Sequence, residues 1–558
     1  MASCRGGRSQ DPASRVTDER TRSWWGWGHE DAPIDQTSFD HILDGLGRAL
    51  DVDGFAETQP PSPGSIELRS PRIGLPRSLT EFCSNDHLDR LSHAYGKSYV
   101  DVMRASRGDV PNPPDLVAYP RNDQQIEELF RFCEAERVAL VPYGGGSSVV
   151  GGVEPPGGDR YTAAITVDMR HFDRILEVET ISQSLHVEAG VFGPALEAGL
   201  KPHGLTLRHF PQSFEFSTVG GWIATRAGGH AASGSTRIDD FVSAVRMLTP
   251  RGVLETRRVP SSGAGPGPER LVLGSEGTLG VITDAWLRVQ PIPRFRAGAI
   301  VHFADGDRAT DAVRGLGQSG LSPSNCRLLS PLEALLTGVG DGNTAELLLG
   351  FESADHPVHG HLDRALQICD TGHATWDASA DEARPSTPEG RWRRWFLQAP
   401  YLRDRLVLRG LIVETFETAV SWDRLARLQE TVLSAVERAI TETGSRGIVT
   451  WRLNYIYPDG AAPYYTVVAL GTRGHEIEQW RRIKEAASAA IHDAGGTITH
   501  HHAVGRDHST WLLRERGALW QEVLAGVKRV LDPAWILNPG VLIPEATARQ
   551  SPVSGDFL

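Results

Sequence analysis

Three glycine-rich stretches within residues 141–283 constrain the fold of this chain more than any other feature. They are VPYGGGSSVVGG (141–152), PQSFEFSTVGGWIATRAGGHAASGSTRIDD (211–240) and GSEGTLGVIT (274–283). A glycine loop after a strand lets backbone N–H groups converge on a phosphate without intruding side chains. Three such segments separated by short strands are hard to explain as turns alone, and they indicate a large, flat ligand that carries a diphosphate.

The first stretch matches neither of two familiar phosphate-binding motifs. A P-loop requires lysine after its last glycine, but Gly152 and Val153 follow Gly151. The G-x-G-x-x-G fingerprint lacks its third glycine, because Val149 stands where that glycine would be. FAD needs a pyrophosphate cradle, room for the isoalloxazine and donors to the flavin edge, and the three stretches together supply these pieces.

Strand-like and helix-like segments mix along the chain and predict an α+β fold. Short strands are expected at 165–169, 175–179 and 184–191, and a long amphipathic helix at 421–444. Trp24, Trp25 and Trp27 predict an aromatic plug packed on the main body. We expect four parts: an N-terminal tail and helical segment (1–110), a two-part FAD-binding domain (111–296), an α+β cap or substrate domain (297–525), and a C-terminal return to the FAD domain (526–558).

Composition excludes several classes of protein. The formal charge of −13 argues against general binding of nucleic acid backbones. Five scattered cysteines without a C-x-x-C pair suggest neither a disulfide framework nor a cysteine zinc site. No secretory signal and no apolar run of about 20 residues is present, so we expect a cytoplasmic protein without a transmembrane span.

A run of histidines, THHHAVG, follows a segment that we predict to be a short strand near the carboxyl end. In an extended segment His500 and His502 would share one face, and His501 would point to the other. From the residues alone, three interpretations stay open: a polar strand end in solvent, a Zn²⁺ or Mn²⁺ site, or acid–base and substrate contacts.

The ordered set GGGSSV, SFEFSTVGGWIATRAGG, GSEGTLGVIT and LDPAWILNPG resembles the FAD-binding domain of the vanillyl-alcohol oxidase superfamily. Members that anchor flavin covalently use His, Cys or Tyr. The matching positions of the glycine loop are Ser147 and Ser148. The resemblance therefore implies non-covalent FAD.

A narrower resemblance is to the alkyldihydroxyacetonephosphate synthase family, through YLRD, ETFETAVSWDR, DGAAPYY and THHHAVG. It implies a catalytic tyrosine at Tyr464, a substrate-binding and catalytic arginine at Arg403, a further important arginine at Arg327, and an essential histidine run at His500, His501 and His502. The implied FAD contacts are Pro142, Tyr143, Gly144, Gly145, Gly146, Ser147, Ser148, Gln212, Ser213, Phe214, Glu215, Phe216, Ser217, Thr218, Thr225, Arg226, Ala227, Gly228, Glu276, Gly277, Thr278, Leu279, Gly280, Val281 and Ile282.

The resemblance implies exchange of the acyl group of acyl-dihydroxyacetone phosphate for a long-chain fatty alcohol, without net redox change. It also implies a lipid tunnel lined from the weakly matching residues 300–400. The alternative is an FAD-linked oxidase or dehydrogenase of a 2-hydroxy acid or alcohol. That branch can hold a metal with His and Glu residues, but NYIYPDGAAPYY contains no histidine and His501 stands at the glutamate position, so we expect no metal. We also expect a homodimer; peripheral membrane contact stays open.

Overall fold

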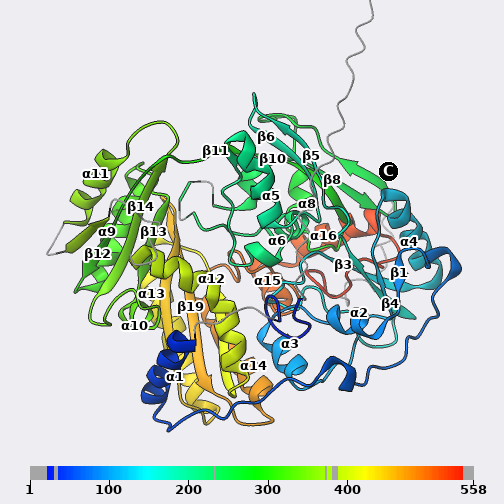
Figure 1. The fold of residues 1–558 in the computed structure, drawn as a ribbon, viewed down its shortest axis with the longest axis horizontal. Coiled ribbons are helices and arrows are strands. Elements are labelled where there is room, and N and C mark those ends of the chain that lie inside the picture. The colour runs from blue at the N-terminus through cyan, green and yellow to red at the C-terminus, as the bar shows by residue number, and fades with distance from the viewer. Residues whose placement is uncertain are drawn as a thin grey trace, which may run out of the picture.

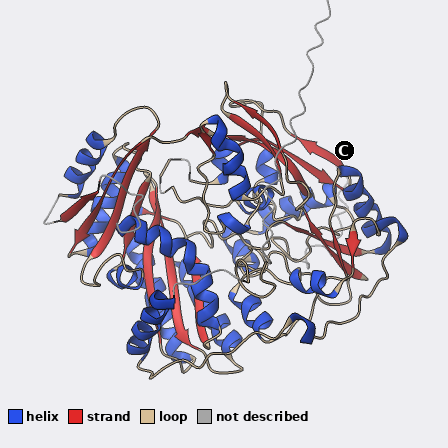
Figure 2. Cartoon of the chain, viewed as in Figure 1, coloured by secondary structure: helices blue, strands red, loops and turns tan. Residues whose placement is uncertain are grey.

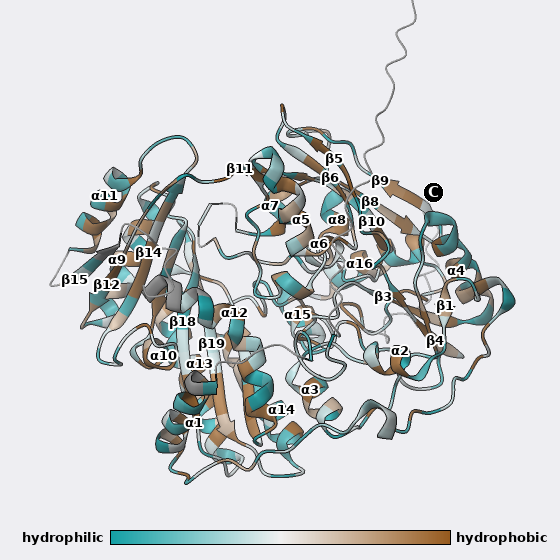
Figure 3. Ribbon diagram, viewed as in Figure 1, coloured by the Kyte–Doolittle hydropathy of each residue, from teal (hydrophilic) through white to brown (hydrophobic). Residues whose placement is uncertain are grey.

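The computed structural model describes residues 22–30, 36–231, 233–234, 236–370, 374–379 and 388–544. Its helices and strands form two groups, with two smaller sheets on one side of Figure 1 and one large sheet on the other. Helices cover the sheets, as Figure 2 shows, and hydrophobic residues run along the strands in Figure 3. The expected α+β architecture is confirmed. The expected N-terminal tail falls largely on residues 1–21, which lie outside the described residues.

One strand of the first small sheet leads directly into the glycines of the first glycine stretch. Its strands are ordered β1-β2-β4-β3, and both pairings of β4 with β2 and β3 are parallel. The strand Val138–Tyr143 is buried along most of its length because helix α4 packs its apolar side against this sheet. The elements in this stretch of the chain are α1 (Gln36–Leu50), β1 (Cys83–Ser84), α2 (His87–Ser92), α3 (Tyr99–Ser106), β2 (Leu116–Ala118), α4 (Asp123–Glu136), β3 (Val138–Tyr143) and β4 (Ala163–Asp168). Of these, α1 and α3 pack on the large sheet.

The second small sheet is antiparallel, in the order β5-β6-β10-β8-β9. Helices α5 and α6 share a hydrophobic cluster with it, in which Trp222 is 1% exposed. The strands expected from sequence at 165–169, 175–179 and 184–191 are confirmed as β4, β5 and β6. The elements in this stretch of the chain are β5 (Ile175–Glu179), β6 (Ser184–Glu188), α5 (Gly193–Leu200), β7 (Leu205–Thr206), α6 (Val219–Thr225), α7 (Ile238–Phe241), β8 (Val242–Thr249), β9 (Gly252–Glu255), α8 (Glu269–Val272), β10 (Val281–Arg288) and β11 (Gln290–Pro291). Strands β7 and β11 pair with each other in a separate two-stranded sheet.

The large sheet has the order β15-β12-β14-β13-β18-β19-β16, and β17 also pairs with β19. All of these pairings are antiparallel. The elements of this sheet and its flanking helices are β12 (Phe295–Phe303), α9 (Gly306–Gln318), β13 (Asn325–Leu329), α10 (Pro331–Leu336), β14 (Ala345–Ser353), α11 (His359–Cys369), β15 (Thr375–Ser379), α12 (Pro388–Val407), β16 (Leu411–Glu417), β17 (Val420–Ser421), α13 (Trp422–Glu442), β18 (Gly447–Ile456), β19 (Gly460–Leu470) and α14 (Glu476–Asp493).

The two faces of the large sheet pack against different helices. Successive side chains of a strand point to opposite faces, so Ile412 and Val467 join the cluster under α9, α11, α13 and α14. Val413 and Val468 instead join a cluster that includes α1 and α12. Helix α13, expected at 421–444, is confirmed; its buried residues recur at helical spacing, which turns one apolar stripe to the sheet.

The carboxyl end returns to the small sheets through α15 (Ser509–Arg516) and α16 (Ala518–Leu531). Leu537 forms a parallel bridge to Leu140 on β3. The buried Lys528 ammonium donates to the Thr278 and Leu537 carbonyls and to the Asp532 carboxylate, at 2.6 to 2.8 Å. These contacts fix the end of the chain to the part that carries the glycine stretches. Among the described residues, no helix is long and apolar enough to cross a membrane.

Candidate active site

A cavity separates the glycine stretches from the large sheet. Counted together with the solvent at its open mouth, the space is about 1910 Å³. The residues expected from sequence that line it are Gly144, Gly145, Gly146, Ser147, Ser148, Gln212, Ser213, Ser217, Thr218, Thr225, Ala227, Gly228, Arg327, Arg403, Tyr464, His501 and His502. This one cavity therefore brings together residues from both sides of the molecule.

The first glycine stretch forms one wall with its backbone. A Cβ on Gly145 would lie 1.8 Å from the Phe216 carbonyl oxygen, and one on Gly144 would lie 2.4 Å from Thr218 Oγ1. The loop is thus pressed onto the second stretch so closely that only glycine fits. Within the described part of the chain, the backbone N–H groups of residues 144–149 have no hydrogen-bond acceptor. A row of unpaired donors in a cavity wall fits a pyrophosphate.

The second glycine stretch continues this wall and touches the large sheet. Thr218 caps α6 by accepting from Gly221 N, and Gln212 donates to the Phe396 carbonyl of α12 at 3.0 Å. A Cβ on Gly228 would meet the Tyr455 hydroxyl at 2.4 Å and His501 Cβ at 3.1 Å. Glycine at 228 therefore allows the two sides of the molecule to meet beside the cavity.

The third glycine stretch does not line this cavity. Val281 and Ile282 lie in the buried strand β10, and Glu276 has a left-handed backbone at φ 49°. The Glu276 carboxylate accepts the backbone N–H groups of Val504 and Gly505 at 2.9 and 2.7 Å, and burial raises its pKa to about 7. The expected FAD contacts that lie outside the cavity lining are Pro142, Tyr143, Phe214, Glu215, Phe216, Arg226, Glu276, Gly277, Thr278, Leu279, Gly280, Val281 and Ile282.

Tyr464 stands on β19 at the polar end of the cavity and is 4% exposed. The guanidinium of Arg452, its cross-strand partner on β18, lies 3.8 Å from the centre of the phenol ring. Burial raises the pKa of the phenol above 10.0, and the Arg452 charge offsets only part of that rise. The positive charge that phenolate formation requires is therefore present on the ring face, although desolvation still favours the neutral phenol.

Arg452 was not identified from the sequence. Its guanidinium is 1% exposed, forms an ion pair with the buried Glu333 of α10, and donates to Asn454 Oδ1 at 3.0 Å. Thr450 donates to the other oxygen of Glu333. One signal was available: a charged residue inside the apolar strand WRLNYIY is seldom buried without a partner. That partner lies 119 residues earlier in the chain, so no local pattern reveals it.

The histidine run bends around one buried carboxylate. Glu417 accepts the backbone N–H groups of His500, His501 and His502 at 2.6, 3.0 and 2.9 Å, and the Thr499 hydroxyl at 2.7 Å. Burial opposes its charge, but interactions with the histidines, His501 first among them, hold its pKa well below the usual range. Glu417 belongs to the ETFETAVSWDR motif, but this role for it was not predicted from the sequence.

The short strand predicted before the histidine run is absent from the structure, and the alternation expected for an extended run is also wrong. Residues 497–502 form bends and irregular backbone. Consecutive N–H groups of a strand point to opposite sides, whereas these three converge on Glu417. As a result His501 and His502 line the cavity together, and His500 does not line it.

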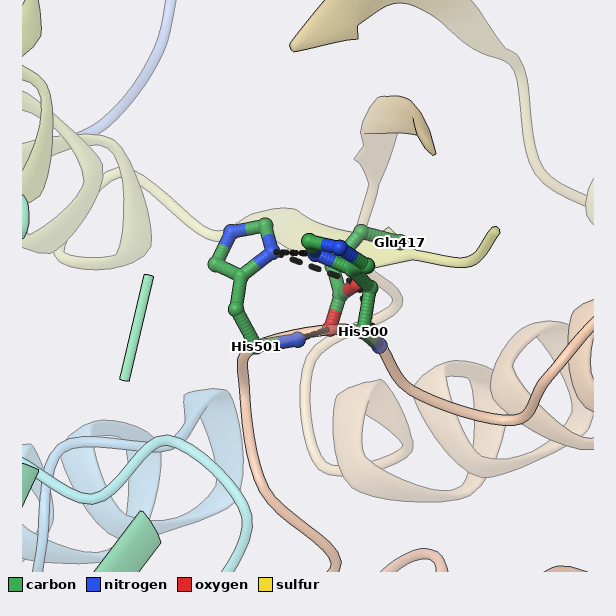
Figure 4. Close-up of side chains that lie close together, drawn as sticks. All are labelled: Glu417, His500 and His501. Carbon is green, nitrogen blue, oxygen red and sulfur yellow. Dashed lines mark hydrogen bonds and ion pairs between the residues drawn. The ribbon is translucent and has the colours of Figure 1, made fainter. Parts of the chain in front are cut away.

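Glu417, His500 and His501 come close enough to share a metal ion, with one ligand atom of each within 4.8 Å of the others (Figure 4). Both Glu417 oxygens already accept backbone or hydroxyl hydrogens. The two histidine Nδ1 atoms face each other at 3.1 Å and bond to each other. The expectation that no metal binds here stays a prediction.

Arg403 and Arg327 lie in the cavity wall at different sites. The Arg403 fork binds Asp404 Oδ1 at 2.6 and 2.9 Å, and Asp404 Oδ2 accepts Trp27 N–H at 2.5 Å. Arg327 donates to the His230 carbonyl and to Asn325 Oδ1, while its buried Nε has no partner among the described atoms. Burial lowers the pKa of Arg327 to about 10, which leaves it charged at neutral pH.

The cavity has a cationic end and an apolar arm. Arg327, Arg403 and Arg452 line it, and no Asp, Glu or Lys does so among the described residues. The apolar arm extends between α1, α12, β16 and β19. Some of its lining residues lie within 300–400, the region expected to line a lipid tunnel, and others lie on either side. They are Ile42, Leu46, Leu336, Trp395, Phe396, Ala399, Pro400, Leu402, Leu406, Val413 and Val468.

Comparisons with known proteins agree with this architecture. Residues 114–257 match the FAD binding domain family, and residues 292–542 match the C-terminal domain of FAD linked oxidases. A D-lactate dehydrogenase [cytochrome] of Arabidopsis thaliana is 27% identical over 443 residues, which cover 78% of this chain and 74% of that protein. The expected FAD-binding fold is thereby confirmed.

Two further matches point to one particular family of FAD-binding proteins. A solved structure of an alkyldihydroxyacetonephosphate synthase superposes with a TM-score of 0.77 at 25% identity, covering 93% of this chain and 98% of the other. The alkyldihydroxyacetonephosphate synthase of Dictyostelium discoideum is 30% identical over 495 residues, which cover 84% of this chain and 79% of that enzyme. This chain belongs to the alkyldihydroxyacetonephosphate synthase family.

Proposed function

We propose that this protein is an FAD-dependent alkyltransferase that replaces the acyl group of acyl-dihydroxyacetone phosphate with a long-chain fatty alcohol. The observation that carries the proposal is the combination of three arginines, Tyr464 and a long apolar arm in one cavity. A keto-phosphate with a fatty chain needs a cationic end for its phosphate and an apolar channel for its tail. A small 2-hydroxy acid would leave the arm unfilled.

The residues of the cationic end have different roles. Arg403 and Arg327 bind the phosphate, because guanidinium groups match its oxygens in geometry and charge. Asp404 occupies one edge of the Arg403 fork and holds the side chain toward the cavity. Positioning a dianion next to Tyr464 fixes the substrate carbon that must lose its proton.

Tyr464 removes a proton from C1 of the substrate, and Arg452 favours the phenolate from the face of its ring. When bound, FAD supplies an electron sink that restores itself within each turnover. His501 and His502 border the same space and hydrogen-bond the departing and entering oxygens. A fatty chain that fills the apolar arm keeps water away from the reacting carbon.

The backbone wall at residues 144–149 holds the FAD diphosphate, and Ser147 and Ser148 offer no group that anchors flavin covalently. Acid precipitation is therefore expected to release all flavin into the supernatant. Flavin that remained with the precipitated chain would contradict this part of the proposal. The homodimer remains a prediction, and peripheral membrane contact stays open.

The deciding experiment is incubation of the purified holoprotein with palmitoyl-dihydroxyacetone phosphate and labelled hexadecanol. We expect labelled 1-hexadecyl-dihydroxyacetone phosphate and free palmitate in equal amounts, with flavin absorbance unchanged at steady state. The alternative oxidase or dehydrogenase would instead bleach the flavin with lactate or glycolate under anaerobic conditions. Bleaching by a hydroxy acid without transfer of hexadecanol would overturn the proposal.

A further inference from the structure

A second cavity borders the histidine run and is independent of the main one in its lining. It is formed by residues 419–421, 459–461 and 495–497 together with Tyr457 and Glu515. Asp459 on its rim is exposed, and Tyr457 is partly exposed. Solvent therefore has access to this cavity from a side of the histidine run that the proposed substrate does not occupy.

A continuous set of hydrogen bonds joins His501, a lining residue of the main cavity, to Tyr457, a lining residue of the second cavity. His501 lines the main cavity, with its ring centre 6.1 Å from that of Tyr464. Its Nδ1 lies 3.1 Å from His500 Nδ1, and His500 Nε2 lies 2.7 Å from the Tyr457 hydroxyl. The Tyr457 hydroxyl in turn lies 3.3 Å from Thr236 Oγ1.

We propose that His501, His500 and Tyr457 form a proton relay that carries the proton released from the substrate in the main cavity to solvent in the second cavity. The proposal rests on the proposed function, because it needs a substrate that loses a proton beside His501. It gives Tyr457 a role in the reaction although Tyr457 does not line the main cavity.

The hydrogen bonds allow only complementary arrangements of protons. Two facing Nδ1 atoms bond only when one carries hydrogen and the other does not. If His501 Nδ1 donates, His500 accepts at Nδ1, carries its own hydrogen on Nε2 and donates it to the Tyr457 oxygen. Tyr457 is then free to donate its hydroxyl hydrogen outward, to Thr236 or to water.

The proton that Tyr464 takes from the substrate passes to His501 at its other ring nitrogen and displaces the Nδ1 hydrogen to His500. His500 passes its Nε2 hydrogen to Tyr457, and Tyr457 releases one to solvent, so charge and hydrogen count balance and no electron moves. Burial lowers the pKa of His500 to about 3, so the ring is neutral before each transfer and does not retain the proton. Glu417 holds the backbone of both histidines in place for the contact.

The test measures by NMR the rate at which the C1 hydrogen of palmitoyl-dihydroxyacetone phosphate exchanges with D₂O when no alcohol is present. Tyr457→Phe keeps the ring but breaks the relay, so we expect exchange at least about tenfold slower, at the lower edge of proton-transfer effects. Added imidazole, which can carry protons into the second cavity, is expected to restore the rate. FAD content should stay at one per chain.

Tyr161→Phe is the matched control, because it too removes a hydrogen-bonded phenol hydroxyl. That hydroxyl donates to the Trp535 carbonyl, and Tyr161 lines neither cavity. We expect this variant to exchange at the rate of the unchanged protein. Normal exchange in Tyr457→Phe would overturn the relay. So would slow exchange that imidazole leaves slow, since that result indicates a structural effect. No exchange in the unchanged protein would overturn the proposed function, and the relay with it.

Discussion

The two walls of the main cavity are built in opposite ways. The wall of the glycine stretches presents backbone N–H groups and small side chains, and no charged side chain of this wall lines the cavity among the described residues. The other wall presents Tyr464, Arg452 and the histidine run. Glu333 pairs with the Arg452 guanidinium, and Glu417 accepts the backbone N–H groups of the histidines. One wall thus offers main-chain donors to a ligand, and the other offers ionisable side chains.

This contrast separates cofactor binding from chemistry. A backbone wall cannot be changed without disturbing its shape, whereas a side chain on the other wall can lose one functional atom and keep its packing. Substitutions in the glycine wall should therefore lower the FAD content of the purified protein and leave the turnover per bound flavin unchanged. Substitutions in the wall of the large sheet should lower the activity and leave the FAD content unchanged.

Tyr464→Phe is expected to have the largest effect on chemistry. It retains the ring beneath Arg452 but loses the hydroxyl, so turnover and C1 hydrogen exchange should fall by about 10²–10⁴-fold while FAD content stays normal. The rate of C1 hydrogen exchange, measured by NMR in the absence of alcohol, tests the base alone. If Tyr464→Phe exchanged C1 hydrogen at the normal rate, Tyr464 would not be the base, and a histidine of the run would take its place.

The pH dependence of the unchanged protein follows from the same residue. Burial raises the pKa of Tyr464 above 10.0, and the phenolate is the basic form. The competent fraction therefore rises with pH, and the logarithm of the exchange rate should increase throughout the neutral range and into the alkaline range. Tyr464→Phe should lose this slope.

The sequence predicted the two walls unequally well. The glycine wall could be inferred because glycine is itself the signal: Gly145 and Gly228 stand where no Cβ fits. In the other wall, Tyr464, Arg403 and Arg327 came from the family resemblance, and all three do line the cavity. Arg452 was missed, because its partner Glu333 is distant in the sequence and close only in the folded sheet.

The histidine run shows why local patterns fail at such a site. Alternation in an extended strand was the natural prediction, but it ignored Glu417, which lies 83 residues before His500 and gathers three consecutive N–H groups. A tertiary contact thus overrides the local conformation. The third glycine stretch is a second example: its Glu276 bonds the segment after the histidines instead of lining the cavity.

Gly145→Ala tests the glycine wall and should have the next largest effect. Its methyl group would lie 1.8 Å from the Phe216 carbonyl oxygen, so the loop must move and the FAD content of the purified protein should fall at least tenfold. Gly263→Ala, whose methyl group meets no atom within 4 Å, is the control and should bind FAD normally. The contrast between the walls would fail if Gly145→Ala kept its FAD but lost turnover per flavin.

Arg403→Lys should have a smaller effect, confined to substrate binding. Lysine keeps the charge but loses the planar fork that Asp404 and a phosphate can share, so KM for the phosphate substrate should rise about tenfold with little change in kcat. Arg405→Lys, two residues further along α12 and outside the cavity lining, is the control. A loss of kcat with unchanged KM would assign Arg403 to the chemical step instead.

Ile42→Ala should have the smallest effect, and it tests the apolar arm apart from both walls. Ile42 lines the arm from α1, while its neighbour Leu43 packs on the same hydrophobic cluster without lining the cavity. Each methylene group that no longer packs on a fatty chain costs about 0.8 kcal/mol, or about fourfold in kcat/KM. We therefore expect a severalfold loss with hexadecanol and almost none with a short alcohol that does not reach Ile42. Leu43→Ala should lower the melting temperature about as much as Ile42→Ala does, but it should change kcat/KM for the long and the short alcohol equally. Equal losses of kcat/KM for long and short alcohols in Ile42→Ala would show that the tail lies elsewhere, and the apolar arm would no longer support a lipid substrate.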